Sequence, residues 1–330
     1  MREKVLITGA SGFVGYHLVE AALQAGLEVH AAVRPSSEVA QLAPFPVKYV
    51  YPDFSDVAEL QKLLQEHEYQ YIIHTAGVTK AKTALAYVTV NAGYTKNLAL
   101  AAVAVQPRLK KFVFISSLAA LGPIAYTDTA PIQEDSRAQP VTDYGRSKLL
   151  AEEYLTEIPE LPLVVLRPTA VYGPREKDIF LLLKTLNSGL DPYIGSKMQR
   201  LSFVYVKDLA KVAVQALTTV ESQGSYNVSD GNSYDRYALA DITKRLLDKK
   251  AIRVHVPLSL VKMLAKVMEA AYARSAVAPV LNKNKLHELT AENWNCSIER
   301  LRQDLGYTPE YDLEKGLAQT LQWYKENKWL

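Results

Sequence analysis

Tyr144 and Lys148 are the side chains best suited to move a proton, because they lie four residues apart in Tyr-Gly-Arg-Ser-Lys. On a helix this spacing places both side chains on one face. An ammonium group near a phenol favours the phenolate, which predicts a lowered tyrosine pKa and a role in acid/base catalysis. The same spacing occurs in three other pairs, Tyr193/Lys197, Tyr311/Lys315 and Tyr324/Lys328.

Two serines end a run of apolar residues at 112–115, namely Ser116 and Ser117. In open α/β sheets the active site lies at the carboxyl ends of the strands. A serine hydroxyl there can donate a hydrogen bond to a substrate carbonyl while Tyr144 supplies the proton. Only the pair Tyr144/Lys148 opens a helix after this strand's loop, so we predict that it is the catalytic pair. A simple strand-end cap is the alternative role for Ser116.

A glycine-rich turn at residues 8–15 follows the first apolar run, 5–7, and opens the first predicted helix. Gly9, Gly12 and Gly15 have the spacing that a dinucleotide site needs for a tight turn, close approach to the pyrophosphate and helix packing. The helix N-terminus would offer N–H groups to the phosphates. The turn therefore predicts a dinucleotide site, and a purely structural turn is the alternative.

The end of the second predicted strand bears on the choice of cofactor. An NAD site usually has an acidic residue about 20 residues beyond the glycines. Val33 stands at that place here, and Arg34 follows it. Because a planar guanidinium suits a 2′-phosphate, the sequence favours NADP(H), with NAD(H) as the alternative. Arg34 could also be an ordinary surface residue.

Short apolar runs alternate with helix-length stretches through the first half of the chain. The predicted strands are 5–7, 29–33, 47–50, 71–73, 112–115, 163–166 and 201–206, and the predicted helices are 13–25, 57–66, 84–105 and 208–217. Near-continuous apolar runs are typical of parallel strands covered on both faces. This predicts an α/β fold, a Rossmann-type doubly wound parallel sheet with a smaller C-terminal α/β substrate lobe. The predicted dinucleotide-binding domain is 1–167 plus 201–222, and the lobe is 168–200 plus 223–330.

Composition narrows the classes of function. The chain has 330 residues, 48% of them hydrophobic, which is enough for a large core. Its net charge of only +3, without a concentrated basic stripe, argues against nucleic-acid binding. A single cysteine cannot form a disulfide within the chain, and the six histidines include no pair at i,i+4 spacing. The sequence therefore predicts neither a disulfide nor a metal site. The N-terminus leads straight into the first strand without an apolar leader, so we expect a cytoplasmic protein.

The motifs taken together resemble the extended short-chain dehydrogenases/reductases, the NAD-dependent epimerase/dehydratase family. They occur in family order over about residues 1–210: the turn at 8–15, Asp53, 74–77, 90–93, 116–119, 144–148, 166–168, 171–174 and 203–208. The closing residues 305–307 and 323–324 extend the likeness nearly to the end. The resemblance implies an NAD(P)-dependent enzyme.

The resemblance also implies roles for individual residues. Ser117, Tyr144 and Lys148 would form the catalytic triad, with Lys148 also holding the nicotinamide ribose. Asp53 and Phe54 would face the adenine, and His74 is expected to be structural. The full predicted cofactor-binding set is Gly9, Ser11, Gly12, Phe13, Val14, Gly15, Arg34, Asp53, Phe54, Thr75, Ala76, Gly77, Asn91, Ser116, Tyr144, Lys148, Pro168, Thr169 and Val171.

Departures from the family pattern bear on the reaction. Relatives that eliminate water carry an Asp-Glu pair directly after the catalytic hydroxyl, where Leu118 and Ala119 stand here. Sugar-nucleotide epimerases commonly have an asparagine where this chain has Ala170, and Arg200 is out of their usual register with Phe203. These differences weaken both sugar-nucleotide interpretations. We expect reduction of a 3-keto lipid or steroid-like ketone, with epimerase and non-catalytic dinucleotide sensor as alternatives.

Residues 258–280 are apolar, contain methionines and carry spaced lysines. A core helix is one interpretation, and a helix in peripheral contact with the inner face of a membrane is the other. The expected partner is a small apolar substrate, and a homodimer is left open. Predicted substrate-pocket walls are Leu118, Ala119, Leu121, Val171, Met263 and Met268.

Overall fold

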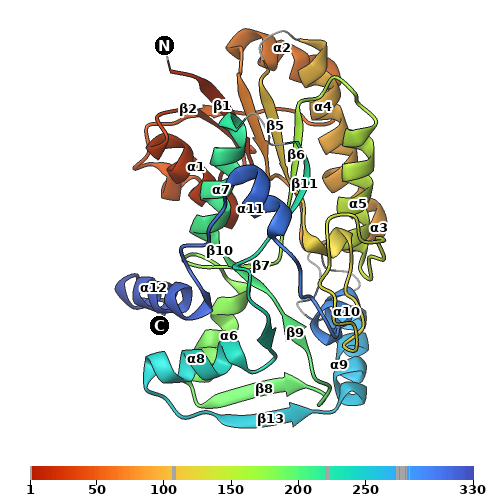
Figure 1. Cartoon of the computed structure of the whole chain (residues 1–330), viewed down its shortest axis with the longest axis vertical. Coiled ribbons are helices and arrows are strands. Elements are labelled where there is room, and N and C mark those ends of the chain that lie inside the picture. Colours follow the sequence, from red (N-terminus) through yellow and green to blue (C-terminus); the bar gives the residue numbers. More distant parts are fainter. Residues whose placement is uncertain are drawn as a thin grey trace.

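A seven-stranded parallel sheet forms the core of the upper half of the molecule (Figure 1). The computed structural model describes residues 2–105, 109–219, 223–272, 275, 279, 281 and 283–330. The strand order is β11-β6-β5-β4-β1-β2-β3. The strands are β1 (Lys4–Thr8), β2 (Glu28–Ala32), β3 (Lys48–Val50), β4 (Tyr71–His74), β5 (Lys111–Ile115), β6 (Leu163–Pro168) and β11 (Gly224–Val228).

Helices cover both faces of this sheet, which confirms the predicted doubly wound α/β fold (Figure 1). Along β1, Val5 and Ile7 face a core shared with α1 (Phe13–Gln24) and α7 (Val206–Thr218). Leu6 faces the opposite core. That second core is closed by α2 (Val57–His67), α4 (Tyr94–Ala104) and α5 (Asp143–Thr156). Because both faces are buried, the strands read as continuous apolar runs.

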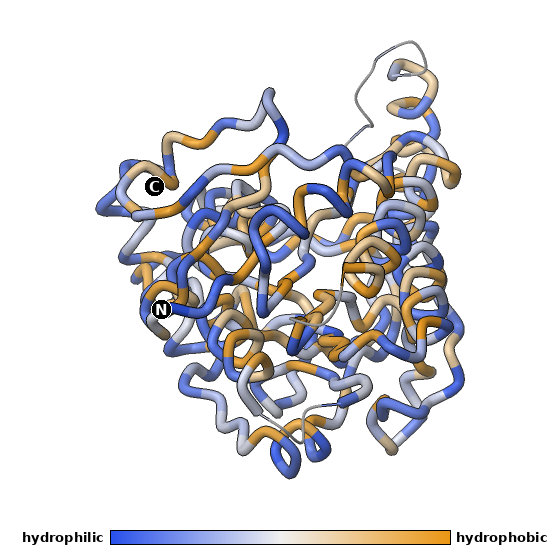
Figure 2. Tube along the Cα trace, turned by 90° about the horizontal axis from the view of Figure 1, so that it is seen from above, coloured by the Kyte–Doolittle hydropathy of each residue, from blue (hydrophilic) through white to orange (hydrophobic). Residues whose placement is uncertain are grey.

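The smaller, lower part packs three helices around its own apolar cluster. They are α6 (Asp178–Asn187), α8 (Ala238–Leu247) and α12 (Leu313–Glu326). The remaining elements are β7 (Ala170–Tyr172), β8 (Leu190–Ile194), β9 (Arg200–Leu201), β10 (Phe203–Tyr205), β12 (Tyr234–Asp235), β13 (Ile252–Val256), α9 (Leu258–Ala271), α10 (Lys283–Thr290), α11 (Glu299–Leu305) and the short helix η1 (Ala40–Leu42). From above, hydrophobic segments concentrate in the interior and hydrophilic ones in the outer loops (Figure 2).

The structure corrects two of the predicted elements and adds a strand that was not predicted. The expected strand 201–206 is two short strands, β9 and β10, and neither joins the central sheet. The seventh strand is instead β11, from a segment that we assigned to the lobe; its sequence Gly-Ser-Tyr-Asn-Val lacks an apolar run because it lies at the sheet edge. The expected helix 84–105 is divided into α3 (Ala84–Tyr87), the π-helical η2 (Val88–Gly93) and α4.

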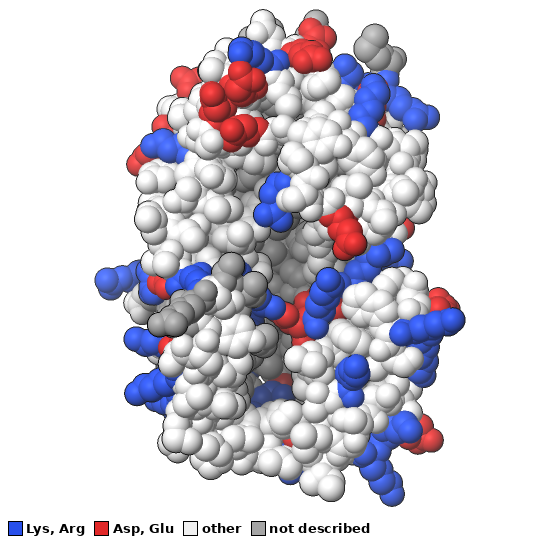
Figure 3. All heavy atoms as spheres, turned by 180° about the vertical axis from the view of Figure 1, so that it is seen from behind, with Lys and Arg blue, Asp and Glu red and all other residues white. Residues whose placement is uncertain are grey.

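A hollow separates the upper and lower parts on one face of the molecule, with charged side chains of both signs at its rim (Figure 3). Strand β6 runs from the upper sheet into β7, which pairs with β10 outside that sheet. The carboxyl ends of the central strands therefore lead toward the lower part. Within the described residues, none of the helices combines the length and apolar character needed to span a membrane.

Candidate active site

The N-terminus of α5 is held against the end of β5. Thr142 caps the helix, since its Oγ1 accepts a hydrogen bond from the Gly145 N–H at 3.0 Å. Gly145 permits a close approach, because a Cβ at this position would lie 2.3 Å from the Ala119 carbonyl oxygen. Ala119 belongs to the short helix η3 (Leu118–Ala120), which Ser117 caps. This packing brings Tyr144 next to Ser117.

Tyr144 is a neutral phenol that hydrogen-bonds to Ser117. Burial raises the pKa of Tyr144 to about 12, and the hydrogen bond from Ser117 opposes that rise. The predicted lowering of this pKa by Lys148 is therefore wrong. The reason is geometric: the Lys148 Nζ donates to the Ile115 carbonyl oxygen at 2.8 Å. Tyr144 at neutral pH is thus suited to donate a proton.

Lys148 is a buried cation at the end of β5. Its Nζ lies 4.6 Å from the centroid of the Phe114 ring. Burial lowers the pKa of Lys148 to about 8, since a buried ammonium loses its hydration. Lys148 is therefore close to losing its charge in mildly alkaline solution.

The other three Tyr/Lys pairs lie in the lower part and hold structural contacts. Tyr193 lies in β8 and stacks on His255. The Lys315 ammonium lies over the Tyr311 ring. The Tyr324 hydroxyl donates to the Glu176 carbonyl oxygen at 2.7 Å. The fold thus favours Tyr144/Lys148, the pair at the sheet edge.

The glycine turn has the form of a phosphate cradle. Helix α1 begins at Phe13, and no side chain caps its first N–H groups. A Cβ on Gly15 would lie 2.0 Å from the Gly9 carbonyl oxygen, so the helix packs directly on the turn. Gly12, Val14 and Ser11 complete the cradle, and the Ser11 carbonyl accepts from Gln41. Open N–H groups at a helix N-terminus fit the diphosphate of a nicotinamide dinucleotide.

A buried hydrogen-bond network fixes the loop after β4 beside this turn. Thr8 Oγ1 contacts His74 Nδ1 at 2.7 Å, and His74 Nε2 contacts Thr95 Oγ1 at 2.8 Å. Burial lowers the pKa of His74 to about 3, so the ring stays neutral and structural. The Ala76 N–H donates to Thr8 Oγ1, which holds the backbone of Thr75, Ala76 and Gly77 against the end of β1.

Asn91 connects the same loop to the catalytic helix. Its Oδ1 accepts from the Val78 N–H at 2.7 Å, and its Nδ2 donates to Ser147 Oγ at 3.0 Å. The residue lies in η2, and π-helical turns often occur at functional sites. Asn91, one of the predicted cofactor-binding residues, thus ties the loop after β4 to α5.

Arg34, Asp53 and Phe54 follow the ends of β2 and β3. The register Thr8–Ala32–Val50 across β1, β2 and β3 places them at the edge of the glycine turn. The Arg34 side chain is exposed. Asp53 accepts from Ser55, which holds the pKa of its carboxyl below the usual value. Phe54 stacks against Tyr94 with centroids 6.4 Å apart.

Ser116 is engaged in a structural contact that the sequence did not indicate. Its hydroxyl hydrogen-bonds to Glu152, and Glu152 pairs with Arg167 at 2.6 Å; all three are buried. The signal that could have revealed this pair is a charged residue, Arg167, inside the apolar run of β6. Ser116 thus matches the strand-end alternative better than cofactor binding.

The remaining members of the predicted cofactor-binding set lie at the end of β6 and in β7. Pro168 ends β6, and the Thr169 N–H donates to the Val228 carbonyl oxygen at 3.0 Å. Val171 is half-buried in β7. The predicted pocket walls Leu118 and Leu121 are wrong, because both are buried in a separate apolar cluster that includes Ile132 and Cys296.

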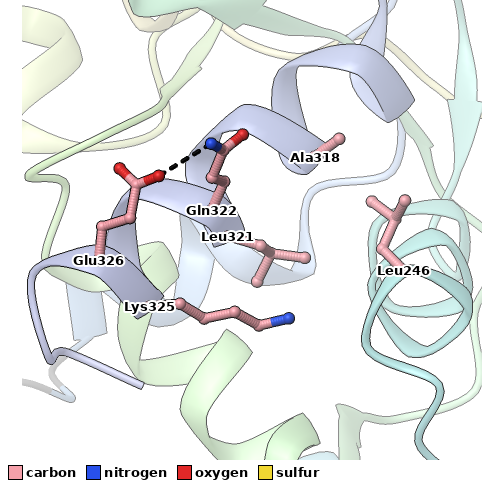
Figure 4. Close-up of a pocket in the computed structure, with 6 residues that line it drawn as sticks. All are labelled: Leu246, Ala318, Leu321, Gln322, Lys325 and Glu326. Atoms are coloured by element: carbon pink, nitrogen blue, oxygen red, sulfur yellow. Dashed lines mark hydrogen bonds between the residues drawn. The ribbon is translucent and has the colours of Figure 1, made fainter.

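Two pockets of the structure lie away from the predicted site residues. One of about 260 Å³ lies between α8 and α12 and is lined by Leu246, Ala318, Leu321, Gln322, Lys325 and Glu326 (Figure 4). A larger one of about 680 Å³ lies between α1 and α7. Among the described residues, no group of three His, Cys, Asp or Glu is arranged to hold a metal ion.

Comparison with known proteins identifies the family. A family model described as NAD dependent epimerase/dehydratase matches residues 5–229, more than half of the chain. The chain belongs to this family. It is therefore an enzyme of the extended short-chain dehydrogenase/reductase type, as the motifs indicated.

Relatives of the chain are named for different reactions, a reductase and an epimerase among them. The chain is 27% identical to the ceramide reductase of Caulobacter vibrioides, with 100% of this chain and 96% of that protein covered. It is 26% identical to the UDP-glucose 4-epimerase of Vibrio cholerae, with 98% and 95% covered. The solved structure of dTDP-glucose 4,6-dehydratase from Bacillus anthracis in complex with NAD shares the fold, with a TM-score of 0.78 at 20% identity over 99% of this chain and 97% of that chain.

Proposed function

We propose that this enzyme reduces an apolar, lipid-like ketone with NADPH, using Tyr144 as the proton donor. The observation that carries the proposal is the neutral Tyr144 phenol beside Ser117, in a site where Leu118 and Ala119 replace the acidic pair that elimination requires. The similarity to a ceramide reductase over the whole chain supports the same class of substrate.

Each residue of the site has its own role in the proposed reduction. The glycine turn would hold a reduced nicotinamide dinucleotide, which when bound would be the source of the hydride for the carbonyl carbon. Ser117 donates a hydrogen bond to the carbonyl oxygen, and Tyr144 transfers its phenolic proton to that oxygen to complete the alcohol. Lys148, whose Nζ lies at the end of β5 against the Ile115 carbonyl oxygen, would hold the nicotinamide ribose.

A nucleotide-sugar substrate is a poorer match to the donors present. Buried phosphates need well-placed hydrogen-bond donors. Ala170 has no side-chain donor, and the Arg200 guanidinium is occupied: it lies 5.0 Å from the centroid of the Tyr126 ring and donates to the Asp128 carbonyl oxygen. A ketone needs only Ser117 and Tyr144 at its carbonyl.

A substrate panel tests the reaction. Purified enzyme with NADPH would be offered long-chain ketones, a 3-keto lipid among them, in parallel with UDP- and GDP-sugars. We expect NADPH consumption with the ketones and no sugar-nucleotide epimer by chromatography. Epimer formation without response to any ketone would overturn the proposal in favour of the epimerase.

The cofactor preference is tested at Arg34. The exposed guanidinium at the edge of the glycine turn would pair with the 2′-phosphate of NADP(H). A lost charge-assisted contact is worth about 1.5–3 kcal/mol, so Arg34→Ala should weaken NADPH binding roughly tenfold or more and leave NADH binding nearly unchanged. Arg2→Ala, before the opposite end of β1, is the control. Equal affinity of the unmodified enzyme for both cofactors would contradict the assignment.

A further inference from the structure

Helix α9 exposes an apolar stripe to solvent. Leu260, Met263, Leu264 and Val267 recur at helical spacing and are 49, 58, 50 and 59% exposed. The residues of α9 that are buried, Val261 and Ala265, lie on another face of the helix. A surface helix ordinarily turns its apolar residues toward the core, so this outward stripe is the reverse of the usual arrangement.

The preceding strand adds apolar side chains at the same end of the molecule. Strand β13 joins α9 through Pro257 alone, and both lie at the lower end in Figure 1. Ile252 and Val254 of β13 are exposed and share one face of the strand. Exposed apolar patches of this kind mark interaction sites.

Lysines flank these apolar side chains along the chain. Lys262 and Lys266 lie on α9, and Lys249 and Lys250 precede β13; none of the four makes an ion pair within the described part of the chain. The acidic residue of α9, Glu269, accepts a hydrogen bond from the Lys283 N–H. The end of the molecule is thus both apolar and cationic.

Helix α10 connects this end to the catalytic helix. Asn284 of α10 accepts a hydrogen bond from the Asp143 N–H at 3.1 Å and donates to the Asp143 carboxylate at 2.9 Å. Asp143 directly precedes Tyr144, and α10 also packs against α9. The exposed stripe therefore lies one helix away from the catalytic tyrosine.

We propose that α9 and the adjoining face of β13 bind the surface of an anionic lipid bilayer. Apolar side chains flanked by lysines suit the boundary between acyl chains and negative headgroups. A second copy of the chain fits less well, because a symmetric contact through this face would bring its unpaired lysines together. The proposal that the chain binds a bilayer does not depend on the proposed reaction. The further idea that this surface delivers a lipid ketone to Tyr144 rests on the proposed function.

Vesicle co-sedimentation of the full chain, without substrate or cofactor, tests the surface. We expect binding to vesicles of phosphatidylglycerol and phosphatidylcholine, weaker binding to phosphatidylcholine alone, and loss of the difference at high salt. Each lysine near an anionic surface contributes roughly fivefold in affinity, so Lys262→Glu/Lys266→Glu should weaken binding by more than an order of magnitude. Met263→Ser/Val267→Ser should weaken binding to both kinds of vesicle.

Matched variants on the other surfaces serve as controls. Leu181→Ser removes a side chain that is 57% exposed on α6, and Lys325→Glu reverses a charge on α12; both should bind like the unmodified chain. Unchanged thermal unfolding of the α9 variants would exclude misfolding as the cause of lost binding.

Three outcomes would overturn the proposal: no sedimentation with anionic vesicles, equal loss of binding in the controls, or a dimer on size exclusion that Met263→Ser/Val267→Ser dissociates. Turnover of a short, water-soluble ketone separates this proposal from the reaction, because Lys262→Glu/Lys266→Glu should retain it. Absence of turnover with every ketone would refute the reaction and leave the vesicle result standing.

Discussion

The edge formed by β5 and α5 and the end formed by β13 and α9 are built in opposite ways. At the catalytic edge, buried polar groups are hydrogen-bonded: Glu152 to Arg167 and Ser116, and Asn91 to Val78 and Ser147. At the α9 end, apolar side chains are left in solvent. The first arrangement holds a few atoms in place for proton transfer, while the second leaves surface free for a partner.

Substitutions at the catalytic edge are expected to have large effects, because its hydrogen-bond networks connect separate elements. The Thr8, His74 and Thr95 contacts join β1, β4 and α4. A buried polar network is stable when every member is satisfied and costly when one is removed. The exposed stripe of α9, in contrast, consists of apolar side chains that make no hydrogen bonds, so the same kind of substitution should have very different effects at the two places.

The largest effect is expected from Tyr144→Phe, which removes the proton donor and leaves the glycine turn intact. Turnover should fall by roughly 10²–10⁴-fold with cofactor affinity retained. Steady-state kinetics and cofactor titration would check this. The control is Tyr193→Phe, a tyrosine of β8 in the lower part of the molecule. An inactive Tyr193→Phe enzyme would show that the active site is misplaced.

Glu152→Ala should destabilise the fold by about 3–5 kcal/mol, because it leaves the buried Arg167 guanidinium without its partner. Urea unfolding measures this change. Glu153→Ala, at the neighbouring exposed position of α5, should change stability by less than about 0.5 kcal/mol. Similar stabilities for the two variants would contradict the buried network.

The pH dependence of reduction should follow Lys148. Its pKa of about 8 means that the ammonium is lost above pH 8, so turnover should then fall by up to about tenfold per pH unit. Tyr144, with a pKa of about 12, stays protonated throughout. Turnover measured from pH 6 to 10 tests this, and a flat profile up to pH 10 would refute it.

Stability should change with pH in the opposite direction. The folded pKa of Lys148 lies below its usual value of 10.5, so between about pH 8 and 10.5 the unfolded chain binds the proton that the folded chain has released. The contribution of Lys148 to folding therefore improves as pH rises through that window. A Lys148→Met variant should lack this component in pH-dependent urea unfolding.

The smallest effect is expected from Leu264→Ala on the exposed stripe of α9. Stability should change by less than about 0.5 kcal/mol, since the side chain is already half in water. The identical change at buried Leu155 of α5 should cost about 2–5 kcal/mol. Calorimetry on the two variants compares the regions directly, and a large loss at Leu264 would show that α9 is part of the core.

Much of the fold could be predicted from the sequence, because buried strands and turns leave their pattern in short stretches of neighbouring residues. The six strands from β1 to β6 lie within the predicted apolar runs or extend them by one or two residues, since strands buried on both faces require such runs. The edge strand β11 was not predicted because the polar residues Ser225 and Asn227 interrupt its apolar pattern. The division of 84–105 into α3, η2 and α4 depends on Asn91 reaching Val78, a contact that helical periodicity does not encode.

By itself, the sequence determined the glycine turn, the Tyr144/Lys148 spacing and the missing acidic pair at Leu118 and Ala119, because these are properties of neighbouring residues. Only the tertiary structure decided which Tyr/Lys pair lies at the sheet edge. It also decided that Ser116 hydrogen-bonds to Glu152, and that burial raises the pKa of Tyr144. It also decided that the apolar stripe of α9 faces outward. Burial and partner choice depend on segments far apart in the chain, which come together only when the sheet and the lobe fold.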